Sequence, residues 1–154
     1  MIKAKADAVL ITKPVGTEAL YDFQIGADGD IVTEDQLDTA ILVSLFTDKR
    51  ATGSQMVLPL RRRGWVGDLE TPEDRYGSHL WLFEQARLTP AVMVRLASLA
   101  QVSLKWMTRD NIATQVSARA TVQTSSVDLQ IDIKKPNSPA EAHLFALWEK
   151  SGKG

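Results

Sequence analysis

The sequence contains no cysteine, which excludes a disulfide framework, a thiolate metal site and a cysteine nucleophile. It also lacks a surplus of either charge: 18 Lys and Arg residues stand against 19 Asp and Glu residues, a formal net charge of −1. A general nucleic-acid-binding domain is usually strongly basic, so this balance disfavours that function. The longest apolar runs, Ile41 to Phe46 and Leu80 to Phe83, are too short to cross a bilayer. We expect no signal peptide and no membrane contact.

The 154 residues are 44% hydrophobic and 24% charged, which is typical of one globular domain. The sequence predicts an α/β (α+β) fold, a single domain with helices packed on a small mixed or antiparallel sheet. We expect an N-terminal arm with short strands over residues 1–29 and a core domain over residues 30–134. A linker and a C-terminal amphipathic helix are expected over residues 135–154.

The chain is organised around a helix that we predict from about Thr33 to Phe46. Thr33 can cap this helix, and Gln36 stands at the capping-box spacing. Apolar residues then recur every four positions, as expected for one buried face. These residues are Leu37, Ile41 and Leu45.

Three later elements are predicted from capping residues and periodicity. Ser78 can begin a short helix that runs to Arg87, and Thr89 with Pro90 begins a longer one that ends near Arg109. Strict alternation over residues 112–123 and 127–134 predicts a β-hairpin, whose open edge is a candidate site for strand addition. Residues 140–150 fit an amphipathic helix.

The segment from Lys49 to Gly77 is long and irregular, and long loops in compact domains usually have a function. At its centre three arginines precede Trp65, which lies between two glycines. Arg and Trp are typical of protein interfaces, so a partner interface is one interpretation. An internal brace, with the arginines paired to the acids of Glu70 to Asp74, is favoured equally. Base stacking against nucleic acid is the least favoured of the three.

No catalytic, cofactor-binding or metal-binding residues are predicted. Six carboxylates could be considered for acid–base chemistry. They lie in the first turn of a predicted helix or in a charged loop, and in both places exposure to solvent accounts for their presence. They are Glu34, Asp35, Asp38, Glu70, Glu73 and Asp74. His79 and His143 lack further ligands at metal-site spacing, and no phosphate loop or nucleophile elbow occurs.

Three ordered blocks of sequence resemble the small baseplate protein of Mu-like contractile-tail phages, the gene-product-forty-six family. The first block comprises Asp30-Ile31-Val32-Thr33, Leu37-Asp38-Thr39-Ala40 and Ser44-Leu45-Phe46-Thr47-Asp48-Lys49-Arg50-Ala51. The second is Arg62-Arg63-Gly64-Trp65-Val66-Gly67-Asp68, and the third begins with Gly77-Ser78-His79-Leu80-Trp81-Leu82. The sequence departs from the family pattern at Val66, where a second aromatic is common. It also has Met107-Thr108-Arg109 where the broader wedge group carries Glu-Pro-Arg.

The resemblance implies a structural, non-enzymatic part of a tail baseplate, similar to the wedge and sheath-initiator proteins that are sometimes labelled lysozyme-like. It implies wedge proteins and tail-tube or sheath subunits as partners. It also implies assembly in the host cytoplasm and a final place in the virion tail. The alternatives are a peptidoglycan-cleaving enzyme and a nucleic-acid-binding module. We predict seven interface residues, namely Arg61, Arg62, Arg63, Trp65, Asp68, Trp81 and Trp148.

Overall fold

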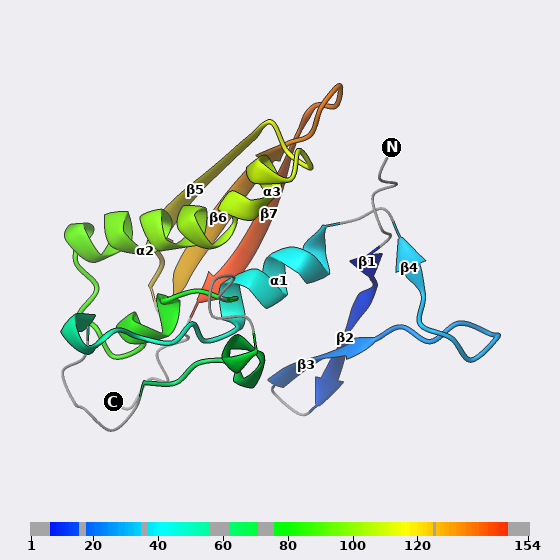
Figure 1. The fold of residues 1–154 in the computed structure, drawn as a ribbon, viewed down its shortest axis with the longest axis horizontal. Coiled ribbons are helices and arrows are strands. Elements are labelled where there is room, and N and C mark those ends of the chain that lie inside the picture. The colour runs from blue at the N-terminus through cyan, green and yellow to red at the C-terminus, as the bar shows by residue number, and fades with distance from the viewer. Residues whose placement is uncertain are drawn as a thin grey trace. The chain divides into compact units, whose positions relative to one another are not determined.

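The computed structural model describes residues 7–15, 18–34, 37–55, 62–70, 76–124 and 126–147 (Figure 1). The chain divides into two compact units, Met1–Val43 and Ser44–Gly154, and helix α1 (Asp38–Phe46) continues across that division. The first unit contains short strands and the second contains helices and a three-stranded sheet. The predicted α+β class is confirmed.

The first unit contains two pairs of antiparallel strands. Strand β1 (Asp7–Ala8) pairs with β4 (Thr33–Glu34), and β2 (Leu10–Val15) pairs with β3 (Glu18–Phe23). Between β3 and β4 the chain reverses through a turn at residues 26–30, as its glycines and aspartates predict.

Helix α1 begins later than its sequence predicts. Thr33 is part of β4 and is not a helix cap, so the predicted start was wrong, while Gln36 lies outside the described residues. Pairing between β1 and β4 holds Thr33 in extended backbone, and the helix begins at Asp38. The predicted apolar face is real, since Ile41 and Leu45 are buried.

The second unit is built on a sheet with the order β5-β6-β7. Strands β5 (Gln115–Val122), β6 (Val127–Lys134) and β7 (Ala140–Leu147) are antiparallel, so the predicted hairpin is confirmed as β5 and β6. Alternation on the central strand β6 places four side chains in the core. These are Val127, Leu129, Ile131 and Ile133, each at most 1% exposed.

Two helices cover one face of this sheet (Figure 1). Helix α2 (Pro90–Ser103) begins as predicted: the Thr89 hydroxyl accepts a hydrogen bond from the Val92 N–H at 3.3 Å, and Pro90 occupies the first helical position. Helix α3 (Lys105–Arg109) follows after Leu104. The buried side of this helix pair consists of Met93, Leu96, Ala100, Leu104 and Met107.

Two predicted helices are absent from the places where the sequence suggested them. Residues 140–147 form strand β7, so the prediction of a helix there was wrong. The Phe145 ring lies edge-on to Phe46, with centroids 6.1 Å apart, on the face of the sheet that is packed. Between Ser78 and Arg87 the only helical turn is η3 (Leu80–Phe83), a short 3₁₀ helix. Two further 3₁₀ turns are η1 (Gly53–Gln55) and η2 (Val66–Leu69).

Candidate interface site

The site rests on a backbone contact between the end of α1 and the segment before η3. Asp48 and Ser78 form an isolated parallel bridge. The Lys49 N–H donates to the Ser78 carbonyl at 2.8 Å, and the Ser78 N–H donates to the Thr47 carbonyl at 2.9 Å. Gly77 permits this approach, because it adopts a φ of +91° and a Cβ there would lie 2.3 Å from the Thr47 carbonyl oxygen.

Side chains of the η3 segment secure the same backbone. The Trp81 indole N–H donates to the Lys49 carbonyl at 2.9 Å, and a ring nitrogen of His79 lies 3.2 Å from the Arg50 carbonyl. Ser78 is buried, and its hydroxyl donates to the Leu45 carbonyl. These contacts account for His79 structurally, as its sequence context predicts. They also fix Trp81 as part of the scaffold of the site.

Arg63 is the centre of an ion-pair cluster. Its guanidinium makes two hydrogen bonds to the Glu84 carboxylate, both 3.0 Å, and a third to Asp48 at 3.1 Å. The same group lies 4.8 Å from the centre of the Trp81 ring, within the range of a cation–π contact. The hydrogen bonds that Arg63 donates to Glu84, together with the negative charges of Glu84 and Asp48, raise the pKa of Arg63, against a smaller lowering by desolvation.

Arg63 is therefore an internal brace, although with other acids than the sequence suggested. Its partners are Asp48 and Glu84, and Glu70 is exposed without a described ion pair. Residues 71–75 lie outside the described residues, so the predicted pairing to Glu73 and Asp74 stays a prediction. The brace joins the segment after α1, the arginine loop and the end of η3.

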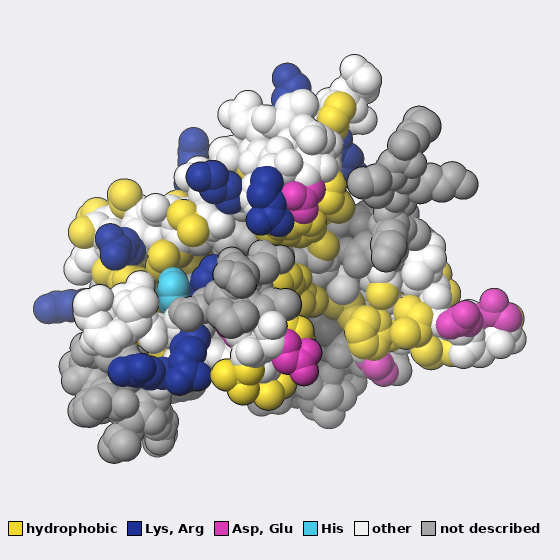
Figure 2. Space-filling model, viewed as in Figure 1, with side chains coloured by type: hydrophobic (Ala, Val, Ile, Leu, Met, Phe, Trp, Pro, Cys, Tyr) yellow, Lys and Arg dark blue, Asp and Glu magenta, His cyan; other side chains and the backbone are white. Residues whose placement is uncertain are grey.

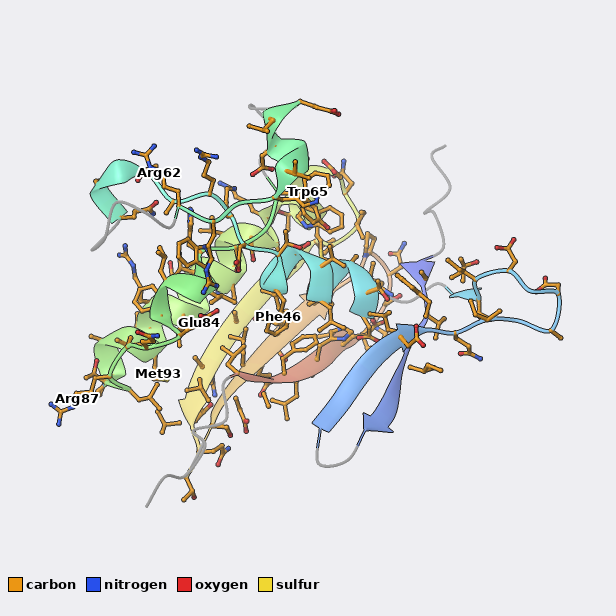
Figure 3. The ribbon with its side chains drawn as sticks, turned by 90° about the horizontal axis from the view of Figure 1, so that it is seen from below. Phe46, Arg62, Trp65, Glu84, Arg87 and Met93 are labelled. Carbon is orange, nitrogen blue, oxygen red and sulfur yellow. The ribbon has the colours of Figure 1, made fainter. Side chains whose placement is uncertain are left out.

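Trp65 lies on the outer side of this brace. Its side chain is 52% exposed, and its ring contacts Tyr76 with centroids 6.2 Å apart. The indole also lies over Gly67, where a Cβ would come within 2.2 Å of a ring carbon. Figure 3 shows Trp65 and Arg62 on a segment that runs on the side of the helices away from the sheet. The ring is held on one side and open to solvent on the other.

The turn η2 extends this exposed surface. Val66 and Leu69 are 74% and 70% exposed, and they stand beside Trp65 in the sequence. Together with Arg62, which is also exposed, these residues form what we call the η2 patch: Arg62, Trp65, Val66 and Leu69. An apolar group with one aromatic anchor and one arginine has the composition of a protein-binding hot spot.

Asp68 supports the η2 patch from inside. It is only 7% exposed, and one carboxylate oxygen accepts a hydrogen bond from the Tyr76 N–H at 3.0 Å. The other oxygen has no partner among the residues that the structure describes. The Asp68 N–H also donates to the Trp65 carbonyl at 3.2 Å, which closes the first turn of η2. Asp68 thus holds the turn and is not available as a contact residue.

The structure sorts the seven predicted interface residues into three groups. Arg62 and Trp65 are exposed, whereas Arg63, Asp68 and Trp81 engage in internal contacts. Arg61 and Trp148 lie outside the described residues. The sequence pattern does not single out Val66 and Leu69, because a four-residue 3₁₀ turn gives no periodic signal that separates exposed from buried positions.

Within the described parts of the chain, no three side chains that could ligate a metal ion are grouped together. The same described ranges contain no helix with the length and apolar character that crossing a membrane requires.

Comparison with known proteins supplies the family. The family model described as phage protein GP46 matches residues 37–140, which run from the residue before α1 to the first residue of β7. The chain belongs to the GP46 family of phage proteins. This match includes the whole η2 patch and its brace.

Two relatives of this GP46-family chain extend the comparison. It is 39% identical over 101 residues to baseplate protein gp46 of Escherichia phage Mu, an alignment that covers 62% of this chain and 68% of the relative. It is 31% identical over 129 residues to Mu-like prophage FluMu protein gp46 of Haemophilus influenzae, with 82% of this chain and 89% of the relative covered.

Proposed function

We propose that this chain is a structural component of a Mu-like phage tail baseplate and that its role is not enzymatic. The observation that carries the proposal is its similarity to the phage Mu baseplate protein, with 39% identity over 101 residues. The η2 patch agrees with this role, since a part of a multiprotein assembly needs an exposed apolar anchor to bind its neighbours.

The finer proposal is that the η2 patch binds a baseplate-wedge protein. Trp65 offers a rigid aromatic surface, and its ring is already ordered by Gly67 and Tyr76. Such ordering reduces the conformational entropy that binding would otherwise cost. The Arg63 brace keeps the loop in place with three hydrogen bonds, so little reorganisation is needed.

A co-expression pull-down tests the baseplate role directly. The full chain is tagged and produced together with the tail proteins encoded beside it, and the eluted material is sized. We expect a stable, stoichiometric complex with at least one of these proteins. Elution of this chain alone would contradict a wedge-binding role.

A zymogram tests the proposal that the chain is not an enzyme. Purified full-length chain is applied to a peptidoglycan-containing gel beside an active lysozyme as the positive control. We expect no clearing from this chain at any load that the control clears. Clearing by the purified chain would overturn the non-enzymatic role and favour the lysozyme-like alternative.

We also propose that strand β5 accepts a strand from a sheath or tube subunit. Among the described strands β5 pairs only with β6, so its other edge is open. The Gln123 N–H donates to the Ser126 carbonyl, and alternation along the strand then directs the N–H groups of Ala118 and Ala120 to the open edge. These N–H groups are free to bind an incoming strand.

Proline at Ala118 should block strand addition while the sheet stays intact. Proline removes one outward N–H, and edge positions of this kind tolerate it. We expect Ala118→Pro baseplates to support little sheath assembly in electron micrographs, whereas Ala118→Ser, which keeps the N–H, assembles normally. Normal sheaths on Ala118→Pro would exclude this edge. A proline at Gln130 is unsuitable for this test, because Gln130 lies on the central strand β6, which is paired on both sides.

A further inference from the structure

The formal charge is unevenly divided along the chain. Residues 1–43 carry three lysines and eight acidic residues, a formal charge of −5, whereas residues 44–154 carry 15 cations and 11 acidic residues, a formal charge of +4. The net charge of −1 conceals this division. An acidic part and a basic part in one chain provide a source of attraction between copies.

The basic part has an exposed helix surface without a described partner. No acidic residue occurs between Glu84 and Asp110, a stretch that contains four cations, Arg87, Arg95, Lys105 and Arg109. Val94, Ser98 and Val102 stand four residues apart and therefore share one side of α2. Val94 and Val102 are 72% and 63% exposed, and the short Ser98 side chain between them is exposed as well. The two valines thus offer exposed apolar surface on this side of the helix, next to the exposed side chain of Gln101.

Arg95 and Lys105 flank this stripe, and both are exposed without an ion pair inside the described part of the chain. Figure 2 shows Lys and Arg side chains on the surface over these helices. We call this surface the cationic helix face; it consists of Val94, Arg95, Ser98, Val102 and Lys105. It lies opposite the side of α2 that packs on the sheet.

The acidic part presents a surface of matching chemistry on the loop between β3 and β4. Ile25 and Ile31 form an antiparallel bridge and are 58% and 43% exposed. Asp28 and Asp30 are exposed at the turn between them, and Phe23, which ends β3, is 46% exposed. In Figure 2 hydrophobic and acidic side chains gather on this loop.

This loop has a defined shape. The Gly26 N–H donates to the Asp30 carbonyl at 2.8 Å, and the Val32 N–H donates to the Gln24 carbonyl at 2.8 Å. One Asp28 carboxylate oxygen accepts a hydrogen bond from the Asp30 N–H at 3.2 Å. We call this surface the acidic loop; it consists of Phe23, Ile25, Asp28, Asp30 and Ile31.

We propose that the acidic loop of one copy binds the cationic helix face of a second copy. Each surface combines exposed apolar side chains with two charges, and the charges are of opposite sign. Burying the apolar groups supplies affinity, while the charges select the partner and the register. The contact joins two different surfaces of the chain. Made once between successive copies it generates a ring or a filament, and made reciprocally between two copies it generates a twofold dimer.

The proposal goes beyond the baseplate role and does not depend on it. The family match begins at residue 37 and leaves out the acidic loop, so the loop's residues are evidence from this chain alone. A second copy is the occupant that the observations favour, because every copy carries both complementary surfaces in equal number. Another tail protein on the cationic helix face is the competing outcome.

Sedimentation velocity of the purified full-length chain tests self-association. We expect the weight-average sedimentation coefficient to rise with protein concentration at about 50 mM NaCl and to fall back to the monomer value at about 500 mM, because salt screens exposed charges. A monomer value at all concentrations in low salt would overturn the proposal, including when a tail protein is found to bind this helix face.

Charge-exchange variants identify the surfaces. The first variant, Arg95→Glu with Lys105→Glu, reverses the helix face. The second, Ala27→Lys with Asp28→Asn and Asp30→Asn, reverses the loop but keeps the side-chain oxygens that accept the turn hydrogen bonds. Each variant alone should self-associate at least roughly tenfold more weakly.

An equimolar mixture of the two variants should associate again. The reversed helix face of the first variant then meets the reversed loop of the second, and the two unchanged surfaces also meet each other. The control matched to the first variant is Arg119→Glu with Lys134→Glu, which makes the same change in net charge as that variant, on exposed positions of the sheet. We expect it to associate as the unmodified chain does. A mixture that stays monomeric, or an equal loss in the control, would overturn the assignment of these surfaces.

Discussion

Replacement of Gly77 by alanine should lower the free energy of unfolding of the second unit by at least ~3 kcal/mol. Two effects add. Gly77 has a φ of +91°, a region that costs a non-glycine residue free energy, and an added Cβ would lie 2.3 Å from the Thr47 carbonyl oxygen. The oxygen belongs to the backbone, so no side-chain rotation relieves the clash. Urea unfolding followed by tryptophan fluorescence measures the effect, since all four tryptophans lie in this unit.

Gly29→Ala is the matched control. Gly29 has a similar φ of +82°, but nothing lies within 4 Å of a Cβ built on it. Its replacement should therefore cost about 1 kcal/mol or less, measured by circular dichroism, because only the backbone strain is introduced. Equal losses from the two substitutions would show that the Thr47 contact does not limit position 77.

Gly77→Ala should also disturb the candidate interface site, because the close contact between Gly77 and Thr47 holds the backbone of the site in place. The contact allows Asp48 and Ser78 to pair, and that pairing brings the Lys49 carbonyl to the Trp81 indole. Trp81 in turn lies beneath the guanidinium of Arg63. Widening the gap at Gly77 therefore loosens the brace and, with it, the loop that carries the η2 patch.

The parts of the fold that could be predicted are those with a local signal. Thr89 followed by Pro90 specifies a helix start through short-range capping, and α2 begins there. Strict alternation over residues 127–134 specifies a strand, because a helix would distribute those apolar residues around its circumference. In both segments the local preference and the final packing agree.

Residues 140–147 show where local signals are insufficient. Only residues 140–143 alternate between apolar and polar side chains, and residues 144–147 are all apolar. Leu144, Leu147 and Trp148 fit one side of a helix, but the helix prediction was wrong. Pairing with β6 determines that this segment forms a strand and not a helix. In that pairing Ile131 lies opposite His143, and Val127 lies opposite Leu147. Such pairing depends on partners across a turn, which a pattern within the segment does not contain.

The site illustrates the same limit for side chains. Three arginines beside a tryptophan indicated a special loop, and under the internal-brace interpretation the acids of Glu70 to Asp74 were the expected partners. The actual partners of Arg63 are 15 and 21 residues away, at Asp48 and Glu84. Arg62, its neighbour, is exposed. Only the folded backbone, with Arg63 at a φ of +36°, separates an internal brace from a surface residue.

Because Arg63 supports the loop internally while the η2 patch is exposed, a variant of the patch alone can test binding without loss of the fold. Removing Trp65 and Leu69 together, as Trp65→Ala with Leu69→Ala, should weaken binding to the wedge partner by at least ~2 kcal/mol, or about 30-fold in Kd. Both side chains are more than half exposed, at 52% and 70%, so the free energy of unfolding should change by less than ~1 kcal/mol. The pull-down with the neighbouring tail proteins measures the first quantity and urea unfolding the second.

Leu144→Ala provides the comparison, since Leu144 is 67% exposed on β7 and loses the same group as Leu69. It should leave the pull-down unchanged. Arg63→Ala is a poor substitute for the double variant, because it breaks contacts to Asp48, Glu84 and Trp81 and so alters the loop itself. If the double variant binds as the unmodified chain does, the η2 patch is not the docking surface. If Leu144→Ala weakens binding equally, the loss is not specific to the η2 patch, and the assignment of the patch as the docking surface fails.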